Sequence, residues 1–140
     1  MESANINVKV APVGIEDDGS LDTPKDWSSA GWYKDGAMPG QNGNLIINAH
    51  YDDNFGKPAA FWQLKNIKVG DKVIVVDSFG RRFTYGVTQY QFIGISDPDR
   101  FKVFENSKSA KITLITCGGV FLPGKATYDK RLAVTGELIR

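Results

Sequence analysis

The sequence predicts a mainly β fold, a closed barrel of seven or eight strands with one or two short helices. Short runs of alternating apolar and polar residues recur along the chain, and turn-rich connections with Gly, Pro, Asn and Asp separate them. No stretch keeps the period of a long helix. Many short strands joined by such turns are typical of a β-barrel. At 140 residues we expect a single domain, residues 1–140.

The first half of the chain alternates strands with irregular segments. Residues 5–11 are expected to form a first strand, and the turn-rich residues 14–43 an irregular wrap pinned by aromatic side chains. Residues 44–50 have the composition of a buried strand that leads directly into His50. A short helix is expected near residues 58–64, because Pro58 suits the first turn of a helix.

The second half predicts the remaining strands. Residues 73–95 read as two strands joined by a tight turn at Ser78 to Gly80. Residues 96–110 form the next connection, with one helical turn expected after Pro98. Residues 111–117 alternate and are rich in β-branched side chains, so that a strand is expected to stop at Cys117, followed by a loop and a last strand at 131–140.

The composition limits the classes of function. Seventeen Lys and Arg oppose sixteen Asp and Glu, and a net charge of +1 gives no reason to expect nucleic acid or an anionic membrane surface as a partner. One Cys and one His exclude an internal disulfide and a Cys/His zinc site. The acidic pairs Asp17–Asp18 and Asp52–Asp53 are expected to be solvated turn residues, and no cofactor or metal is predicted.

Three side chains supply the chemistry that the sequence offers. His50 and Cys117 are unique and each follows or ends a predicted strand, while Arg131 opens the last strand. Considered one at a time, each residue is more often structural than catalytic: a lone Cys is usually buried and inert, a lone His usually a structural group, and such an Arg usually solvated. Together they form a minimal set for acyl transfer: a thiolate nucleophile, an acid and base, and a cation that stabilises an oxyanion.

The residues alone leave two functions open. One is this acyl transfer, and the other is a non-catalytic β-barrel that binds an extended peptide or a glycan through Trp27, Trp32 and Trp62. Tryptophans packed against the barrel would argue against the binding module, and exposed tryptophans would favour it.

Five stretches resemble the sortases, bacterial cysteine transpeptidases that anchor surface proteins to the cell wall. TLITC at 113–117 resembles the signature around the sortase nucleophile, and NLIINAH at 44–50 the strand that leads to the catalytic His. FWQLKNIKVGDKVIVV at 61–76 and YDKRLAVTGEL at 128–138 resemble the segments that follow the His and that carry the catalytic Arg. GWYKDGAMPGQNGN at 31–44 is most similar to the class E and F branch.

The resemblance implies a sortase-type barrel, with His50, Cys117 and Arg131 as the catalytic residues. It implies cleavage of an LPXTG-like sorting signal between Thr and Gly, through a thioester, and transfer to an amine of a peptidoglycan precursor. Hydrolysis, or pilin polymerisation through a lysine amine, would use the same chemistry with another acceptor. The expected place of action is the extracellular face of the bacterial membrane, and we expect a monomer.

Further expectations concern the substrate and the membrane. Thr116, Ile95, Val120 and Phe121 are predicted to contact the peptide, from their positions beside the nucleophile or in nearby loops. The resemblance implies an N-terminal membrane anchor, which this stretch of sequence lacks because no run reaches the ~20 apolar residues of a membrane helix. The sequence departs from the sortase pattern at Ala49, where sortases usually have Gly before the catalytic His.

Overall fold

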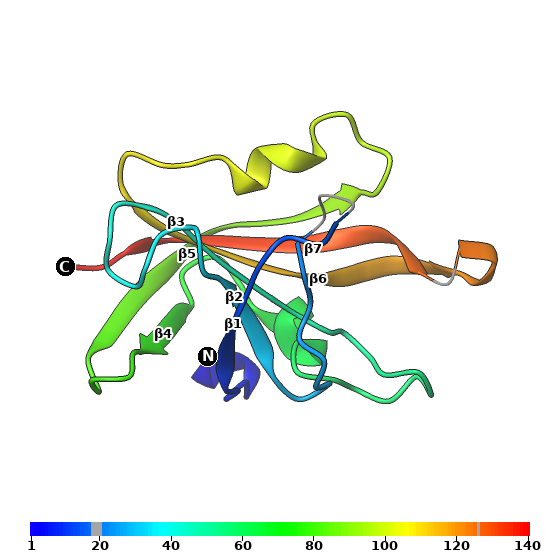
Figure 1. Ribbon diagram of the computed structural model, residues 1–140, viewed down its shortest axis with the longest axis horizontal. Coiled ribbons are helices and arrows are strands. Elements are labelled where there is room, and N and C mark those ends of the chain that lie inside the picture. Colours follow the sequence, from blue (N-terminus) through cyan, green and yellow to red (C-terminus); the bar gives the residue numbers. More distant parts are fainter. Residues whose placement is uncertain (18–20, 126) are drawn as a thin grey trace.

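A computed structural model describes residues 1–17, 21–125 and 127–140, and at 117, 119, 120, 125 and 127 it describes the backbone alone. The strands of this part form one seven-stranded sheet in the order β1-β2-β3-β6-β7-β5-β4 (Figure 1). They are β1 (Val10–Val13), β2 (Ala30–Tyr33), β3 (Gly43–Ala49), β4 (Lys72–Val76), β5 (Arg82–Gly94), β6 (Ala110–Leu122) and β7 (Thr127–Leu138). The helices are 3-10 helices: η1 (Glu2–Ala4), η2 (Trp62–Asn66), η3 (Arg100–Phe104) and η4 (Pro123–Lys125).

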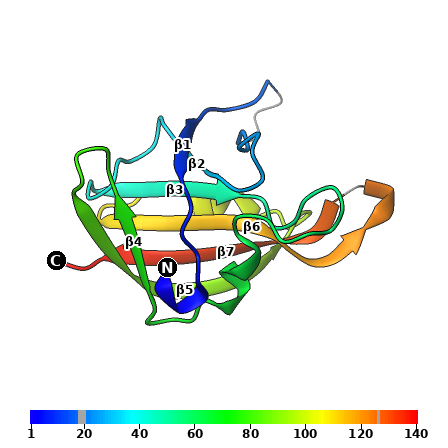
Figure 2. The ribbon, with the colours of Figure 1, turned by 90° about the horizontal axis from the view of Figure 1, so that it is seen from below.

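The sheet curls around a core on its concave face as a half-barrel; among the described strands β1 and β4 are its two edges, whereas the sequence predicts a closed barrel. The residues 1–9 cross this face between the edge strands β1 and β4, and η2 lies on the same side (Figure 2). The main hydrophobic cluster fills the concavity with side chains such as Leu45, Leu64 and Leu114. Figure 1 shows the β5–β6 connection, which contains η3, on the opposite face of the sheet.

The central position of β3 and β6 follows from their composition. Every residue of β3 is buried, which requires cover on both faces and suits an apolar strand that pairs in parallel with β6. Alternation sends Leu45 and Ile47 into the main core. The residues between them lie toward the other face, where a second cluster of Ile93, Val103 and Ala133 packs under η3.

Buried hydrogen bonds attach the η3 connection to this second face. The Asn44 side chain donates to the carbonyl oxygens of Val103 at 2.8 Å and Glu105 at 3.1 Å. Its own oxygen accepts a hydrogen bond from the Thr113 hydroxyl at 2.7 Å. Asn44 and Thr113 are buried, so their polar groups are satisfied inside the protein and fix the connection above β3 and β6.

Several predicted elements need correction. Residues 14–43 are not wholly irregular, because they contain β2, whose short length and turn-rich surroundings hide it in the sequence. The first strand lies at Val10–Val13 and includes Pro12, which an edge strand tolerates. β6 does not stop at Cys117 but continues to Leu122, and β7 begins at Thr127, so most of the expected loop is a β-hairpin with an irregularity between Gly118 and Phe121.

The remaining predictions agree more closely. The paired strands within 73–95 are β4 and β5, and the turn between them includes Gly80 with a positive φ of 80°. The helix expected near 58–64 is the 3-10 helix η2, which begins later at Trp62. The turn after Pro98 is η3.

Gly136 in β7 is required by the close approach of β5. A Cβ atom at this position would lie 2.7 Å from the Gly86 carbonyl oxygen and 3.3 Å from the Ile112 side chain. Gly136→Ala should therefore lower the free energy of unfolding by about 1–3 kcal/mol, seen as a lower Tm in thermal unfolding. Gly124→Ala is the matched control, since among the described residues no heavy atom beyond its chain neighbours lies within 4 Å of a Cβ there. Equal Tm values for the two variants would contradict this account.

Candidate active site

Strand pairing sets Cys117 and Arg131 opposite each other, and His50 follows the end of the neighbouring strand β3; we call these three residues the row. β6 pairs antiparallel with β7, and this register sets Cys117 opposite Arg131. β6 also pairs in parallel with β3 up to Asn48 opposite Ile115. Continuing that register by two residues brings His50 level with Cys117. Since neighbouring strands lie 4.7–4.9 Å apart, the outer two backbone positions of the row are about 10 Å from each other.

A further hydrogen bond holds this end of β3 against β6. The Thr116 hydroxyl donates to the Ala49 carbonyl oxygen at 2.9 Å, and both side chains are buried. The Ala49 methyl group packs in the main core on the concave face. The methyl group that distinguishes this chain from the usual sortase Gly is therefore accommodated in the core.

The loop between β1 and β2 sets the orientation of the His50 ring. Nε2 lies 2.7 Å from the Pro24 carbonyl oxygen, and because a carbonyl only accepts, Nε2 carries the hydrogen. In the neutral ring Nδ1 is then the nitrogen with a free electron pair. The Trp27 ring lies against the imidazole with centroids 4.4 Å apart and an interplanar angle of 58°.

The loop is itself held by hydrogen bonds to the ends of the strands. The Asn48 side chain donates to the Asp22 carbonyl oxygen at 3.0 Å, and Ala60 N–H donates to the Trp27 carbonyl oxygen at 3.0 Å. Asp26 accepts from Ser28 N–H at 3.0 Å, the Ser28 hydroxyl at 2.9 Å and the Ser29 hydroxyl at 2.9 Å. These bonds lower the pKa of the Asp26 carboxyl, with the Ser28 backbone bond as the largest cause.

Arg131 and Tyr128 connect the other side of the row to the loop that follows His50. Nη1 of Arg131 lies 3.3 Å from the Tyr128 carbonyl oxygen and 3.2 Å from that of Lys130. The Tyr128 hydroxyl donates to the Asp52 carboxylate at 2.5 Å. The Tyr128 ring meets the Tyr51 ring edge-on, with centroids 5.4 Å apart. The residues directly after His50 thus contact the residue three positions before Arg131.

The predicted substrate contacts have different surroundings. Thr116 is 2% exposed and its hydroxyl is engaged by Ala49, so its position supports a role in holding β3 rather than the direct peptide contact expected from sequence. Phe121 is 49% exposed and packs on Tyr128, with centroids 5.3 Å apart. Ile95 is half-buried beside β7, where its N–H donates to the Asp129 carbonyl oxygen. The side chain of Val120 lies outside what the structure describes.

Two of the three tryptophans are half-buried, and Trp27 is 39% exposed. Trp27 packs on His50, and Trp32 donates from Nε1 to the Ala37 carbonyl oxygen at 3.1 Å and packs against the core. Trp62 stacks on Tyr51 at 4.4 Å, with the Lys65 ammonium 3.8 Å from the centre of its ring. This packing argues against the peptide- or glycan-binding module as the alternative function.

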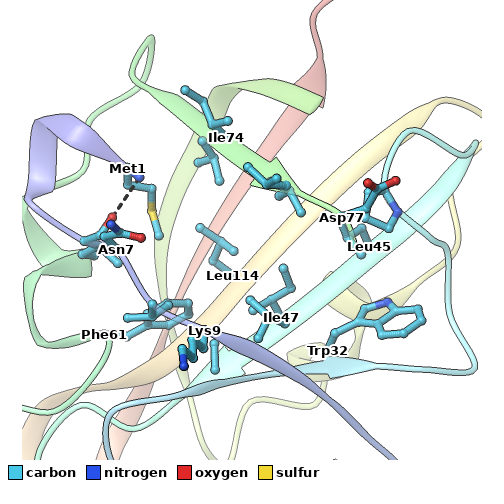
Figure 3. Close-up of a pocket in the computed structure, with 18 of the residues that line it drawn as sticks. Met1, Asn7, Lys9, Trp32, Leu45, Ile47, Phe61, Ile74, Asp77 and Leu114 are labelled. Carbon is cyan, nitrogen blue, oxygen red and sulfur yellow. Dashed lines mark hydrogen bonds between the residues drawn. The ribbon is translucent and has the colours of Figure 1, made fainter. Parts of the chain in front are cut away.

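The large cavity belongs to the other face of the sheet. A hollow of about 620 Å³ lies between the edge strands β1 and β4. Leu45, Ile47 and Leu114 line it together with Phe61 and Ile74 (Figure 3). Leu45 and Ile47 alternate along β3 with Asn44 and Asn48, the residues that bond to the η3 connection and the β1–β2 loop. The hollow is therefore the interior of the curled sheet and not the site at the row.

Two further properties concern ligands and membranes. Within residues 1–17, 21–125 and 127–140, no three His, Cys, Asp or Glu side chains gather as a metal site would require. Over the same residues, none of the helices has the length and apolar character needed to cross a bilayer.

A family model for the sortase domain matches residues 1–139. The chain belongs to the sortase family. This sortase is 31% identical over 115 residues to sortase A of Bacillus anthracis, an alignment that covers 80% of this chain and 48% of that protein. The chain thus spans about half the length of that relative.

Solved sortase structures share the fold. Sortase A of Listeria monocytogenes superposes with a TM-score of 0.74 at 24% identity, over 99% of this chain and 83% of that one. Sortase C1 of Streptococcus agalactiae gives 0.74 at 19% identity, over 100% and 65% of the two chains. These likenesses confirm the predicted sortase-type β-barrel, while the class E or F assignment stays a prediction.

Sequence reasoning missed the neighbours of the row in this sortase. Asp52 was expected to be a solvated turn residue, yet it accepts the Tyr128 hydroxyl; its neighbour Asp53 does cap a turn, bonding to the N–H groups of Phe55 and Lys57. The other expected acidic turn includes Asp18, which lies outside the described residues. No sequence pattern indicates that the Pro24 carbonyl oxygen bonds to His50. The contact between Trp27 and His50 is suggested only by the position of an aromatic residue in the loop before the strand that leads to His50.

The pKa of Asp26 makes the stability of the β1–β2 loop dependent on pH. A carboxyl whose pKa is lowered by folding stabilises the fold above its ordinary value of about 3.9, and this contribution is lost as pH falls through the lowered value. The Tm difference between the wild type and Asp26→Ala should be largest near neutral pH and shrink in acid. Asp26→Asn is the matched control, because its amide oxygen accepts at any pH. A difference that stays constant across the acid range would refute this origin.

Proposed function

We propose that this sortase is a cysteine transpeptidase that cleaves an LPXTG-like sorting signal between Thr and Gly and transfers the acyl group to an amine of the cell wall. The observation that carries the proposal is that Cys117 on β6 pairs with Arg131 on β7, while continuing the β3–β6 register past Ala49 would bring His50 level with both. Sortase family membership supports the same chemistry. The described chain would act as one catalytic domain, monomeric, on the extracellular face of the membrane.

In the first half of the reaction, the Cys117 thiolate attacks the carbonyl carbon of the threonine in the sorting signal. The carbonyl oxygen gains negative charge, which the Arg131 guanidinium stabilises. The C–N bond to glycine breaks as His50 gives a proton to the departing amine. The products are a thioester between Cys117 and the signal, and a free amino-terminal glycine fragment.

In the second half, an amine of a peptidoglycan precursor attacks the thioester carbonyl. His50, now neutral, takes the proton from the attacking nitrogen, and the C–S bond breaks. The new amide leaves and Cys117 returns to its thiolate form. Water or a pilin lysine in place of the wall amine would give hydrolysis or pilin polymerisation by the same steps.

The contacts around the row suit these roles. With Nε2 bonded to the Pro24 carbonyl oxygen, Nδ1 of His50 is the nitrogen that exchanges the proton. Arg131 is half-buried, and its bonds to the Tyr128 and Lys130 carbonyl oxygens fix Nη1. A guanidinium held in this way is preorganised, so stabilising the oxyanion requires little rearrangement. We infer that Ile95, Phe121 and Val120 flank the peptide.

The thiol role predicts a specific loss of turnover. Cys117→Ala should reduce cleavage of a fluorogenic LPXTG peptide to the background rate, because it removes the single thiol in the sequence. Parallel reactions with a glycine peptide, a stem-peptide amine and a lysine peptide identify the acceptor by the mass of the product. Cleavage that persists unchanged in Cys117→Ala, with the Tm retained, would contradict the proposal.

The oxyanion role predicts that charge alone is insufficient at position 131. Arg131→Lys keeps the positive charge but loses the planar fork of donors, and kcat should fall at least ~10-fold. Arg82→Lys is the matched control, since Arg82 is exposed at the start of β5 and far along that strand from Ile93, the partner of Arg131. Similar rates for the two variants would show that a point charge suffices.

A further inference from the structure

Tyr128 contacts the residues that follow His50 and also contacts Arg131. Its hydroxyl donates to Asp52 at 2.5 Å, two residues after His50. Its ring meets the Tyr51 ring edge-on at an interplanar angle of 85°. Its carbonyl oxygen accepts from Nη1 of Arg131 at 3.3 Å. One residue thus joins the chain that leaves β3 to the cation on β7.

This contact matters because strand pairing does not fix His50 as firmly as its partners. The β3–β6 register ends at Asn48, and β3 ends at Ala49. Beyond that point the chain is no longer part of the β3–β6 ladder, and an isolated bridge joins Asp52 to Pro58 in the following loop. Cys117 and Arg131, in contrast, lie inside the β6–β7 ladder. The position of His50 therefore depends on contacts outside the sheet.

We propose that Tyr128 and Asp52 are positioning residues, which set the separation between His50 and the Cys117–Arg131 pair. This inference rests on the proposed transpeptidase function. It assigns to Tyr128 and Asp52 the alignment of His50 with Cys117 and Arg131. The contact crosses the end of β6 directly from β7 to the loop after β3. Neither side chain needs to touch the substrate for this role.

The chemistry of the contact suits a rigid link. A phenol donating to a carboxylate makes a charge-assisted bond, and a separation of 2.5 Å lies at the short end of the range for such bonds. Both residues are half-buried, so water competes less for the carboxylate than it would on an open surface. The Phe121 ring packs on the Tyr128 ring and reduces the freedom of the phenol further.

The test removes each half of the contact and measures peptide turnover. Tyr128→Phe and Asp52→Ala should each lower kcat about 10-fold, with KM changed less than about 2-fold, because the catalytic groups are misplaced while the peptide still binds. The double variant should lose about as much as either single variant, since the two residues act as one unit. Asp52→Asn should recover kcat to within about 3-fold of the wild type, because its amide oxygen still accepts the phenol.

Tyr85→Phe is the matched control. It removes a hydroxyl that accepts from the Gly40 N–H at 3.0 Å, eight residues along β5 from Ile93, the strand partner of Arg131, and should leave kcat unchanged. A Tyr128→Phe variant that retains the wild-type kcat, or a double variant whose loss is the product of the two single losses, would overturn the positioning role. Tm values near that of the wild type establish that a loss of kcat is not unfolding.

Alkylation of the single thiol by iodoacetamide tests the positioning role without requiring peptide turnover, so its result is independent of the proposed function. The rate follows the thiolate fraction, which depends on the cations near the sulfur. Tyr128→Phe should change the dependence of this rate on pH, and Tyr85→Phe should not. If the wild type cleaves no sorting peptide, the proposed function fails while this profile still tests the positioning. An identical profile for Tyr128→Phe and the wild type would overturn the inference.

Discussion

The double pairing of β6 is the constraint on which the site depends. β6 makes a parallel ladder with β3 on one side and an antiparallel ladder with β7 on the other. Because side chains alternate with a period of two, a slip of one residue in either ladder would separate the members of the row. The buried residues of β3 and β6 resist such a slip, since it would turn their apolar side chains out of the core. The core that stabilises the fold therefore also aligns the chemistry.

The two faces of the sheet have separate tasks. The concave face holds the main core and the hollow beneath residues 1–9, and the other face holds the η3 connection. On that second face, Asn44 and Asn48 use their side chains to bind backbone carbonyl oxygens of two different loops. Buried amides need such partners, so one strand anchors both loops. Loops attached in this manner can border a reactive centre and still present fixed atoms to it.

Local pattern and resemblance predicted much of this arrangement. The alternation in 73–95 and 111–117 was sufficient for β4, β5 and most of β6, and the resemblance supplied the sortase fold. Its assignment of His50, Cys117 and Arg131 as catalytic residues stays a prediction. The sequence did not predict β2, because a strand of four residues between turns shows little alternation of apolar and polar residues. The continuation of β6 past Cys117 was not predicted, because a glycine pair usually ends a strand. Here the β6–β7 ladder continues beyond an irregularity. Contacts such as Pro24 with His50, or Tyr128 with Asp52, depend on tertiary geometry that no local pattern records.

The bond from His50 to the Pro24 carbonyl oxygen has a consequence for the order of events. A ring anchored through one nitrogen has a single site for exchanging protons, so in the proposed double displacement the same nitrogen must serve the amine that departs and the amine that arrives. Both must then occupy one location in turn. The departing amine would have to leave that location before the acceptor amine could bind there. This order is the structural basis of a ping-pong mechanism.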